Sequence, residues 1–384
     1  MSTAADLLQE RRLMKFGFIV EANVPHGLTQ HRRYKQMIDE AVFAEEAGFD
    51  FWGASEQHFM GNIGMSATEV MYAAVAAKTS RIRLRHMIRL LLKFNHPLRI
   101  AEQLTTLDLI SDGRAELGTG RSNSIIALNA FGIDPTETRA QWNESLDIIA
   151  TALSEEWTEH KGKYWTIPPT YLTPKPLQEP HPPLSVAASS MEMHQIAGEK
   201  GIGCMGFDNY LGWGRVEDAA KLYKEAIKAP TAQVGKCVND TLSFLVLPAY
   251  CAKTREKALK EGGPTVIEFL RVVIQVYENL AKTSPDYAYM AESGTIASML
   301  DDIDQLLEHT PGVLCGTPEY FVEQIARLES LGYDEVILRV DGDMTHRQIM
   351  EALDLIGAHV IPSFKSPRNV MWGSPFGEGT TFLP

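Results

Sequence analysis

The stretch His96–Ser122, HPLRIAEQLTTLDLISDGRAELGTGRS, predicts a helix, a tight turn and a strand in direct succession. Pro97 suits a first helical turn, where its missing N–H needs no partner, and apolar residues follow at helical spacing (Leu98, Ala101, Leu104, Leu107, Leu109). Ser111-Asp112-Gly113 predicts a turn, and Arg114–Thr119 predicts a strand followed by Gly120 and Arg121. Ligands of parallel α/β folds bind at the carboxyl ends of strands, so an arginine there predicts an anion site.

The same alternation of strand and helix continues on both sides of this stretch. Strands are predicted at 15–20, 49–55, 82–92, 114–119, 184–188, 202–206, 241–248 and 335–340. Helices are predicted at 31–47, 66–79, 97–110, 138–157, 191–200, 214–228, 318–331 and 345–361. Eight strands with intervening helices predict a closed (β/α)8 TIM barrel. A doubly wound sheet is the alternative, because alternation alone does not establish closure.

The chain of 384 residues is longer than a plain barrel of about 250 residues requires. We predict one domain, 1–384, with an insertion at about 253–315 between strand seven and its helix. Within the insertion, Val266–Leu280 is apolar nearly all round and is expected to be buried, by packing first, a dimer contact second or a lid third. A proline-rich loop is predicted at Pro168–Pro183, and an irregular tail at 362–384 that carries Trp372, Phe376 and Phe382.

Composition narrows the class of protein. A content of 45% hydrophobic and 22% charged residues is typical of a globular protein, and the net charge of −13 argues against nucleic acid and anionic membranes as partners. The four cysteines have no metal-like spacing, so free thiols and a cytoplasmic location are expected, without a zinc site. The first twelve residues lack the pattern of a secretory signal, and no segment has the roughly 20 apolar residues of a membrane helix.

The second predicted strand ends in Ser55-Glu56-Gln57-His58-Phe59. A carboxylate and an imidazole at a strand end suit proton transfer and hydrogen bonding to a polar substrate. The structural alternative is a buried hydrogen-bonded pair of Glu56 and His58 without chemistry. We therefore take Glu56 and His58 as candidate catalytic residues.

The third predicted strand carries arginine at alternating positions, 81, 83, 85 and 89. Alternate strand residues face opposite sides, so this set is expected to face the barrel interior or its rims. Arg81 and Arg83 can reach the amino-terminal rim, whereas Arg85 and Arg89 lie nearer the carboxyl end. There Arg89, and with less support Arg85, is expected to meet an anionic cofactor or an acidic substrate group. An ion pair with a strand-end carboxylate such as Glu56 is the equal alternative.

These motifs together resemble the bacterial luciferase-like family of flavin-dependent monooxygenases. The family shows HP at a helix start, then LD-x-x-S-x-GR before an apolar strand that ends in G-x-x-R, as in residues 96–121. It also has E-H-H after strand two, whose first histidine takes part in the chemistry. Gln57 occupies that position here, so the usual imidazole is absent and Gln57 itself becomes a candidate site residue.

The resemblance also implies which residues hold the flavin. Arg121 matches the arginine that contacts the flavin phosphate, with Gly118 and Gly120 beside it, and Arg139 matches a second arginine at the start of a helix. The segment after strand five matches the family's phosphate-binding serine and amides, through Ala187, Ala188, Ser189, Ser190 and Met193, the last in place of a hydroxyl residue. A helix that begins near Ser190 offers free N–H groups and a positive dipole end, although simple N-capping gives the same pattern.

The resemblance implies a two-component monooxygenase. Reduced FMN (FAD is the alternative) would come from a separate NAD(P)H:flavin reductase, and one oxygen atom of O2 would pass to a small organic substrate by hydroxylation or Baeyer–Villiger insertion. A homodimer is the family expectation. Two other functions stay open: deazaflavin (F420)-dependent hydride transfer on the same barrel, and a non-catalytic flavin-binding homologue.

Overall fold

The computed structural model describes residues 13–61, 63–207 and 211–365 and contains a closed parallel barrel. The barrel strands are β1 (Lys15–Val20), β2 (Phe51–Ala54), β3 (Arg83–Arg85) continued by β4 (Arg89–Leu90), β5 (Ala115–Gly120), β8 (Leu184–Ala188), β9 (Gly203–Gly206), β10 (Leu242–Val246) and β13 (Glu335–Arg339). Each of these strands pairs in parallel with its neighbour around the barrel, and the pairing of β3 and β4 with β5 closes the ring. The predicted TIM barrel is confirmed, and the doubly wound sheet is excluded.

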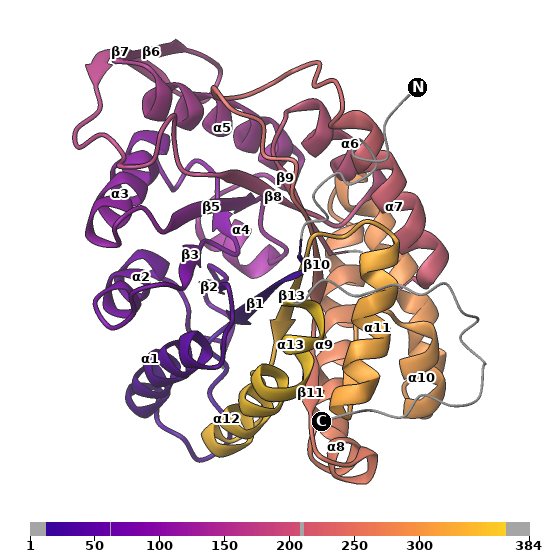
Figure 1. Cartoon of the computed structure of the whole chain (residues 1–384). Helices are drawn as coiled ribbons and strands as arrows, with labels where there is room; N and C mark the ends of the chain where they lie inside the picture. Colours follow the sequence, from indigo (N-terminus) through magenta and orange to yellow (C-terminus); the bar gives the residue numbers. More distant parts are fainter. Residues whose placement is uncertain (1–12, 62, 208–210, 366–384) are drawn as a thin grey trace, which may run out of the picture.

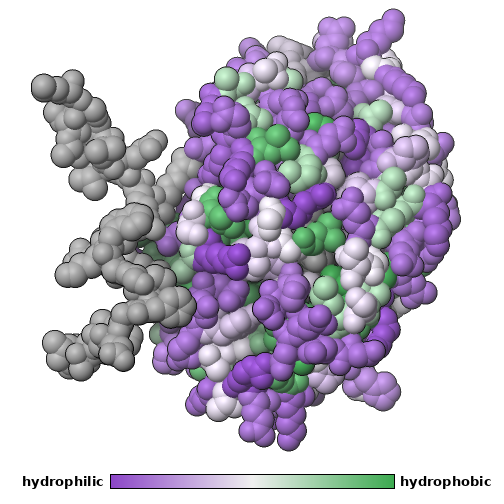
Figure 2. All heavy atoms as spheres, turned by 90° about the vertical axis from the view of Figure 1, so that its right-hand side faces the viewer, coloured by the Kyte–Doolittle hydropathy of each residue, from purple (hydrophilic) through white to green (hydrophobic). Residues whose placement is uncertain are grey.

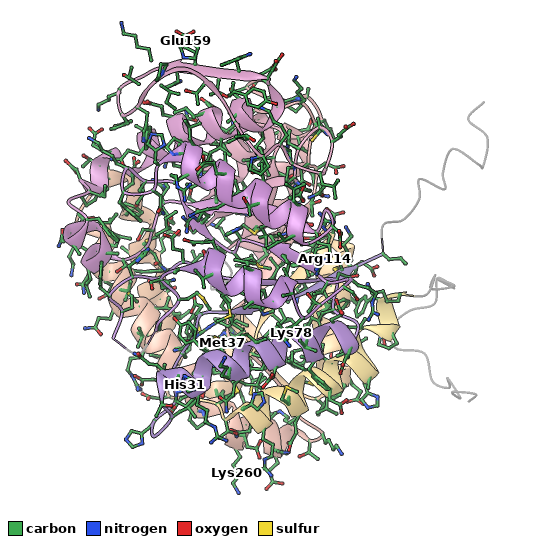
Figure 3. The ribbon with its side chains drawn as sticks, turned by 90° about the vertical axis from the view of Figure 1, so that its left-hand side faces the viewer. His31, Met37, Lys78, Arg114, Glu159 and Lys260 are labelled. Atoms are coloured by element: carbon green, nitrogen blue, oxygen red, sulfur yellow. The ribbon has the colours of Figure 1, made fainter. Side chains whose placement is uncertain are left out.

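Helices surround the barrel (Figure 1). They are α1 (Gln30–Glu46), α2 (Thr68–Ala76), α3 (Pro97–Ile110), α5 (Thr138–Ser154), α6 (Met191–Glu199), α7 (Trp213–Ala226), α11 (Pro318–Ser330) and α12 (His346–Leu355). Figure 3 shows the side on which Met37 of α1, Lys78 after α2 and Arg114 before β5 lie. Arg114 donates hydrogen bonds to the carbonyl oxygens of Ala76, Thr79 and Ile82. The arginine of the S-D-G-R motif therefore binds the carbonyl groups that end α2.

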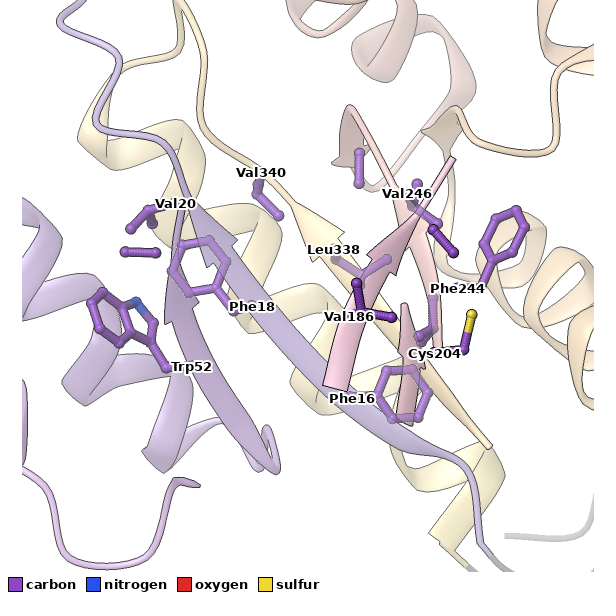
Figure 4. Close-up of a cluster of buried hydrophobic side chains, with 14 of the residues drawn as sticks. Phe16, Phe18, Val20, Trp52, Val186, Cys204, Phe244, Val246, Leu338 and Val340 are labelled. Atoms are coloured by element: carbon purple, nitrogen blue, oxygen red, sulfur yellow. The ribbon is translucent and has the colours of Figure 1, made fainter. Parts of the chain in front are cut away.

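Two hydrophobic clusters hold the barrel. The larger one lies between strands and helices and includes Phe16, Phe18 and Val20 of β1, three of the side chains that Figure 4 labels. The alternate residue Ile19 faces the other way, into a smaller cluster inside the barrel with Phe51, Met87, Met205, Leu245, Leu247 and Ile337. The period of two along each strand thus separates an outer core from a narrow inner one.

The insertion after β10 is an ordered part of the fold. It contains β11 (Ala249–Cys251), α8 (Arg255–Glu261), α9 (Gly263–Ala281), the 3-10 segment η2 (Pro285–Met299), α10 (Ile303–His309) and β12 (Leu314–Gly316). The expected burial of 266–280 holds for one face of α9 only, because Val266, Leu270 and Leu280 are buried whereas Val272 is 42% exposed. Packing, the first of the three predicted roles, is confirmed; the dimer contact stays a prediction.

Other differences from the sequence expectations are local. The predicted helix 138–157 ends at Ser154, and a hairpin of β6 (Trp157–Lys161) and β7 (Thr166–Tyr171) follows outside the barrel. α4 (Ile125–Ala130) and the 3-10 turn η1 (Pro135–Glu137) precede α5. The predicted helix 345–361 is α12 followed by a π-helical turn, η3 (Ile356–Val360). A short helix, α13 (Pro362–Lys365), begins what was expected to be irregular tail. The rest of that tail, with Trp372, Phe376 and Phe382, lies outside the described residues.

None of the described helices is both long and apolar enough to cross a membrane. The face shown in Figure 2 is mostly hydrophilic, and its hydrophobic side chains form small separate groups. None of the four cysteines forms a disulfide, and Cys204, Cys251 and Cys315 are buried.

Candidate functional site

A pocket with an open volume of about 830 Å³ lies at the carboxyl ends of the barrel strands, and we call it the inner pocket. Its apolar wall comes from Ile19, Met87, Ile88, Leu90, Val186, Phe207, Leu245 and Leu247. Its polar groups come from Glu21, Ser55, Glu56, Gln57, Arg121, Ser122, Asn123 and Ser189. The insertion adds Tyr287, Tyr289 and Met290 from η2, so it forms one wall of the pocket as well as packing on the barrel.

The predicted site residues divide into two groups. Seven line the inner pocket: Glu56, Gln57, Gly120, Arg121, Ala187, Ser189 and Met193. The other seven are not among its lining residues: His58, Arg85, Arg89, Gly118, Arg139, Ala188 and Ser190. Each of the second group has a distinct structural reason for its position.

Glu56 is the best-connected carboxylate of the inner pocket. Its Oε2 accepts a hydrogen bond from the N–H of Leu90 at 2.8 Å and lies 3.4 Å from Nη1 of Arg89. Its Oε1 accepts from Nδ2 of Asn95 at 2.9 Å and lies 2.9 Å from Nε2 of His58. Burial alone would raise the pKa of Glu56, but these four partners outweigh it and lower the pKa. Glu56 is therefore held as a carboxylate.

His58 forms the predicted pair with Glu56 but points away from the inner pocket. Its ring packs edge-on against Phe94 and Phe131, at centroid distances of 5.5 and 5.0 Å. The side chain is only 10% exposed. This arrangement matches the structural alternative, a buried hydrogen-bonded pair, whereas Gln57 is the member of the triplet that faces the pocket.

Arg89 lies behind the pocket wall rather than in it. Its guanidinium contacts Glu69 of α2 at 3.1 Å and Gln103 of α3 at 3.0 Å, in addition to Glu56. Met87 and Ile88 both line the pocket, so the alternation breaks between β3 and β4 and positions after the break change sides. The prediction treated residues 82–92 as one continuous strand, and it therefore placed Arg89 on the side that faces the barrel interior. The ion pair with Glu56, the equal alternative, is what the structure shows.

Arg85 lies before the break and points into the barrel, toward its amino-terminal end. Its Nε lies 2.5 Å from Glu116 and its Nη1 lies 2.5 Å from Glu335. Arg83 pairs with the same Glu116. Two guanidinium groups and two carboxylates thus compensate one another, with the exposed Lys15 ammonium 3.9 Å from Glu335 as well. Arg85 lies in this ion cluster instead of making the expected contact with a cofactor.

The cationic end of the inner pocket is formed by Arg121. Its Nη1 lies 3.4 Å from Oδ2 of Asp286, and its guanidinium stacks over the ring of Tyr287 at 5.0 Å. The same Oδ2 accepts a hydrogen bond from Nε of Arg139 at 3.1 Å, and Arg139 also pairs with Glu192. The two predicted arginines are therefore brought together, with one carboxylate between them.

The segment after β8 contributes two pocket residues, Ser189 and Met193, and one helix cap. The Ser189 hydroxyl faces the inner pocket and bonds the hydroxyl of Tyr289. Ser190 is the N-cap of α6 and accepts a hydrogen bond from the N–H of Met193 at 3.2 Å, which is the N-capping alternative. Ala188 faces the outer hydrophobic core.

The two predicted glycines are packing positions. A Cβ on Gly118 would lie 2.1 Å from the carbonyl oxygen of His86. A Cβ on Gly120 would lie 2.5 Å from the side chain of Ile88. Only a glycine fits where the segment between β3 and β4 approaches β5 this closely, and Gly120 also lines the inner pocket.

Sequence reasoning missed Glu21, the residue that follows β1. Its Oε2 lies 3.1 Å from Nε of Arg339, which also lies 2.8 Å from Asp341. Burial, the largest cause, and the nearby Asp341 raise the pKa of Glu21, although Arg339 and a hydrogen bond from Gln57 oppose this. A carboxylate directly after an apolar strand was the available signal, because strand ends in this fold carry the site.

A second cavity with an open volume of about 940 Å³, which we call the outer chamber, adjoins the inner pocket. The two share Glu21, Gln57, Asn123, Phe207 and Leu247. Its remaining walls come from α9, from the loop after β2 and from the segment around Arg339. The barrel mouth therefore contains two joined spaces with Glu21 at the junction.

Comparison with known proteins identifies a family. The family described as luciferase-like monooxygenase matches residues 14–335. Among curated relatives, the oxygenase component of the flavin-dependent trigonelline monooxygenase of Acinetobacter baylyi is 23% identical over 92% of this chain and 97% of its own. Limonene 1,2-monooxygenase of Rhodococcus erythropolis is 26% identical over 90% of this chain and 83% of its own.

Solved structures share the fold. The monooxygenase RslO1 of Streptomyces bottropensis is 25% identical, with a TM-score of 0.75 over 91% of this chain and 100% of its own. The oxygenating constituent of 3,6-diketocamphane monooxygenase of Pseudomonas putida, solved with FMN, is 22% identical with a TM-score of 0.74 over 92% and 100%. The F420-dependent tetrahydromethanopterin reductase of Methanopyrus kandleri is 20% identical with a TM-score of 0.69 over the same shares.

Proposed function

Because the chain belongs to the luciferase-like monooxygenase family, we propose that it is the oxygenase of a two-component system that binds reduced FMN in the inner pocket. A separate NAD(P)H:flavin reductase would supply the reduced flavin. The substrate would be a small organic molecule that receives one oxygen atom from O2. FAD is the alternative flavin, and a homodimer and a cytoplasmic location remain predictions from the sequence.

The shape of the inner pocket is the observation that carries this proposal. A flavin mononucleotide has a flat, largely apolar ring system at one end and a phosphate at the other. The pocket has an apolar wall from β1, β8 and β10 and a cationic end at Arg121. Asp286 already holds a carboxylate oxygen between Arg121 and Arg139, which marks that position as one that accepts an anion.

The residues present therefore fit the group. Arg121, Ser189 and the first turn of α6 would hold the phosphate end, and Ile19, Val186 and Leu245 would contact the ring. The flavin, when bound, supplies the electrons that activate O2. Tyr287, Tyr289 and Met290 of η2 would exclude water from the ring, which a reactive oxygen species requires.

Glu56 and Gln57 would act by position rather than by proton transfer. The lowered pKa of Glu56 keeps it charged at neutral pH, so it holds Asn95 and the backbone of Leu90 in the pocket wall. The Gln57 amide hydrogen-bonds the Glu21 carboxyl. Gln57 cannot titrate as the family's histidine does, and light emission is therefore not expected of this chain.

A relative of this chain supports the two-component form. The Acinetobacter baylyi relative is called an oxygenase component, which implies a partner that supplies reduced flavin. Deazaflavin-dependent hydride transfer is the second candidate, because an F420-dependent reductase shares the fold. A non-catalytic flavin-binding protein is the third, because Gln57 replaces the family's histidine.

Anaerobic titration with reduced FMN, followed by exposure to air, tests the proposal. We expect the wild-type protein to bind reduced FMN and the Arg121→Ala variant to bind it roughly tenfold to a hundredfold more weakly, because it loses a charge-assisted hydrogen bond. Arg99→Ala is the matched control, since Arg99 is 68% exposed on α3 and pairs with Glu102 of the same helix.

Three outcomes separate the candidate functions. Oxygen uptake with reduced FMN that rises with a substrate panel supports the oxygenase. Binding of reduced F420 without oxygen uptake supports hydride transfer. Flavin binding without turnover supports the non-catalytic homologue, and no retention of reduced FMN together with an unchanged Arg121→Ala variant contradicts the proposal.

A further inference from the structure

The outer chamber has the composition of a site for an apolar molecule. Phe207, Val273, Val276 and Tyr277 line it, with Ile63 on the opposite side. The open space between these side chains is about 940 Å³, including the part that is open to solvent. The body of a bound molecule would therefore be apolar.

The charges of the outer chamber are unbalanced. Its described lining residues include three carboxylates, Glu21, Glu268 and Asp343, and a single guanidinium, Arg339. Of these carboxylates, Glu268 is 66% exposed and is screened by water, whereas the side chain of Glu21 is 15% exposed. The carboxylate that a bound molecule would feel most strongly is therefore Glu21.

Arg339 does not neutralise Glu21 completely. Its guanidinium lies 2.8 Å from Asp341, donates to Asn23 at 2.6 Å and stacks over the ring of Phe269 at 4.5 Å. Glu21 shares this one cation with Asp341, which is fully buried. Two carboxylates against one guanidinium leave one negative charge in excess at the junction of the two spaces, and burial raises the cost of that charge.

A ligand can relieve this excess charge in only two ways. A cationic group placed against Glu21 would compensate it directly, and a neutral hydroxyl or amide N–H would donate a hydrogen bond to it. An anionic group would add a second uncompensated charge in a partly desolvated place. Burial is the largest cause of the raised pKa of Glu21, and the nearby Asp341 adds to it, whereas Arg339 lowers it.

We propose that the outer chamber binds an apolar molecule whose polar group is a cation or a neutral hydrogen-bond donor held by Glu21, and that it rejects carboxylates. This substrate class rests on the proposed function, since the chamber opens into the inner pocket where the flavin would react. It reverses the acidic substrate group that Arg85 and Arg89 suggested in the sequence. Both of those guanidinium groups are compensated by carboxylates outside the chamber.

Three probes with the same ring and different charge test this inference: cyclohexylmethylamine, cyclohexylmethanol and cyclohexanecarboxylate. Binding is measured by calorimetry at neutral pH on the full chain without flavin. We expect the amine to bind at least about tenfold more tightly than the carboxylate, with the alcohol between them, because hydrogen bonds to charged groups contribute that much.

Two variants test whether Glu21 causes the preference for the amine over the carboxylate. In Glu21→Gln the affinity ratio of amine to carboxylate is expected to fall about tenfold, because the buried charge is gone. Glu159→Gln removes the same formal charge from the exposed hairpin, away from the chamber lining, and is expected to leave the ratio within about twofold. The comparison of the three probes on the wild-type protein needs no variant, so it decides the inference even if Glu21→Gln folds poorly.

The outcomes are distinct from those for the proposed function. Carboxylate binding as tight as amine binding, no binding of any probe, or an unchanged ratio in a folded Glu21→Gln protein overturns the inference. Amine preference in a protein that does not bind reduced FMN would support the chamber and contradict the flavin proposal. Flavin binding without amine preference would do the reverse.

Discussion

The barrel contains buried ion clusters at both ends, and the two differ in charge balance. At the amino-terminal end, Arg83 and Arg85 meet Glu116 and Glu335, and the exposed Lys15 lies 3.9 Å from Glu335, so both carboxylates are compensated. At the carboxyl-terminal end, Glu21 and Asp341 share the single Arg339. The balanced cluster contributes no lining residue to the inner pocket or the outer chamber, whereas the unbalanced cluster lies at the junction of these two spaces.

This difference teaches how to separate structural from functional charges in the same fold. A closed cluster satisfies its own members and has no use for a ligand. A buried cluster with an excess charge destabilises the folded protein unless a ligand compensates that charge. Titratable groups with perturbed pKa values are frequent at such functional sites. Burial alone does not make the distinction, because Arg85 and Arg339 are both buried.

The largest expected effect breaks the balanced cluster. Glu116→Gln leaves Arg85 with one carboxylate and Arg83 with none of its cluster partners. We expect the free energy of unfolding to fall by about 3–5 kcal/mol, as when one partner is removed from a buried ion pair. Chemical denaturation followed by circular dichroism measures it. Glu159→Gln on the exposed hairpin is the control, and a Glu116 variant no less stable than this control would show that the cluster contributes little.

A somewhat smaller effect is expected in the pH dependence of the free energy of unfolding. Burial opposes ionisation of Glu116, but Arg85 and Arg83 outweigh it and hold its pKa at about 2, against 4.5 in the unfolded chain. The folded-state pKa is lowered, so the contribution of Glu116 is fully present above about pH 4.5 and is lost as pH falls toward 2. It amounts to about 3 kcal/mol by linkage.

Unfolding free energies measured between pH 2 and 6 check this dependence. The wild-type curve should fall more steeply on the acid side than the curve of Glu116→Gln. Parallel curves for the two proteins would show that other carboxylates account for acid unfolding.

The smallest expected effect is on the affinity for reduced FMN at the carboxyl-terminal end of the barrel. Asp286 competes with a ligand anion for Arg121 and Arg139, but it is 33% exposed and partly screened by water. Asp286→Asn should therefore tighten binding of reduced FMN by roughly threefold to tenfold, about 1 kcal/mol. Equilibrium titration measures it, with Asp304→Asn as the exposed control. Weaker binding would mean that Asp286 orients the two arginines instead of competing.

Much of the candidate site followed from motifs read at strand ends. Four predicted residues line the inner pocket: Glu56, Gln57, Arg121 and Ser189. They lie together because the carboxyl ends of all parallel barrel strands meet at the same rim. Arg89 does not line the pocket, because a break of one position between β3 and β4 moves a side chain to the opposite face. No local signal in that arginine-rich strand marks the break.

The sequence by itself determined the order of strands and helices, the barrel and the family, since apolar periodicity and turn residues are local and act within each segment. Only the tertiary structure decided which charges are compensated. Glu21 and Arg339 are adjacent because β1 pairs with β13 and closes the ring, a contact between the two ends of the described chain. Charge balance depends on distances across the barrel, and these exist only after closure.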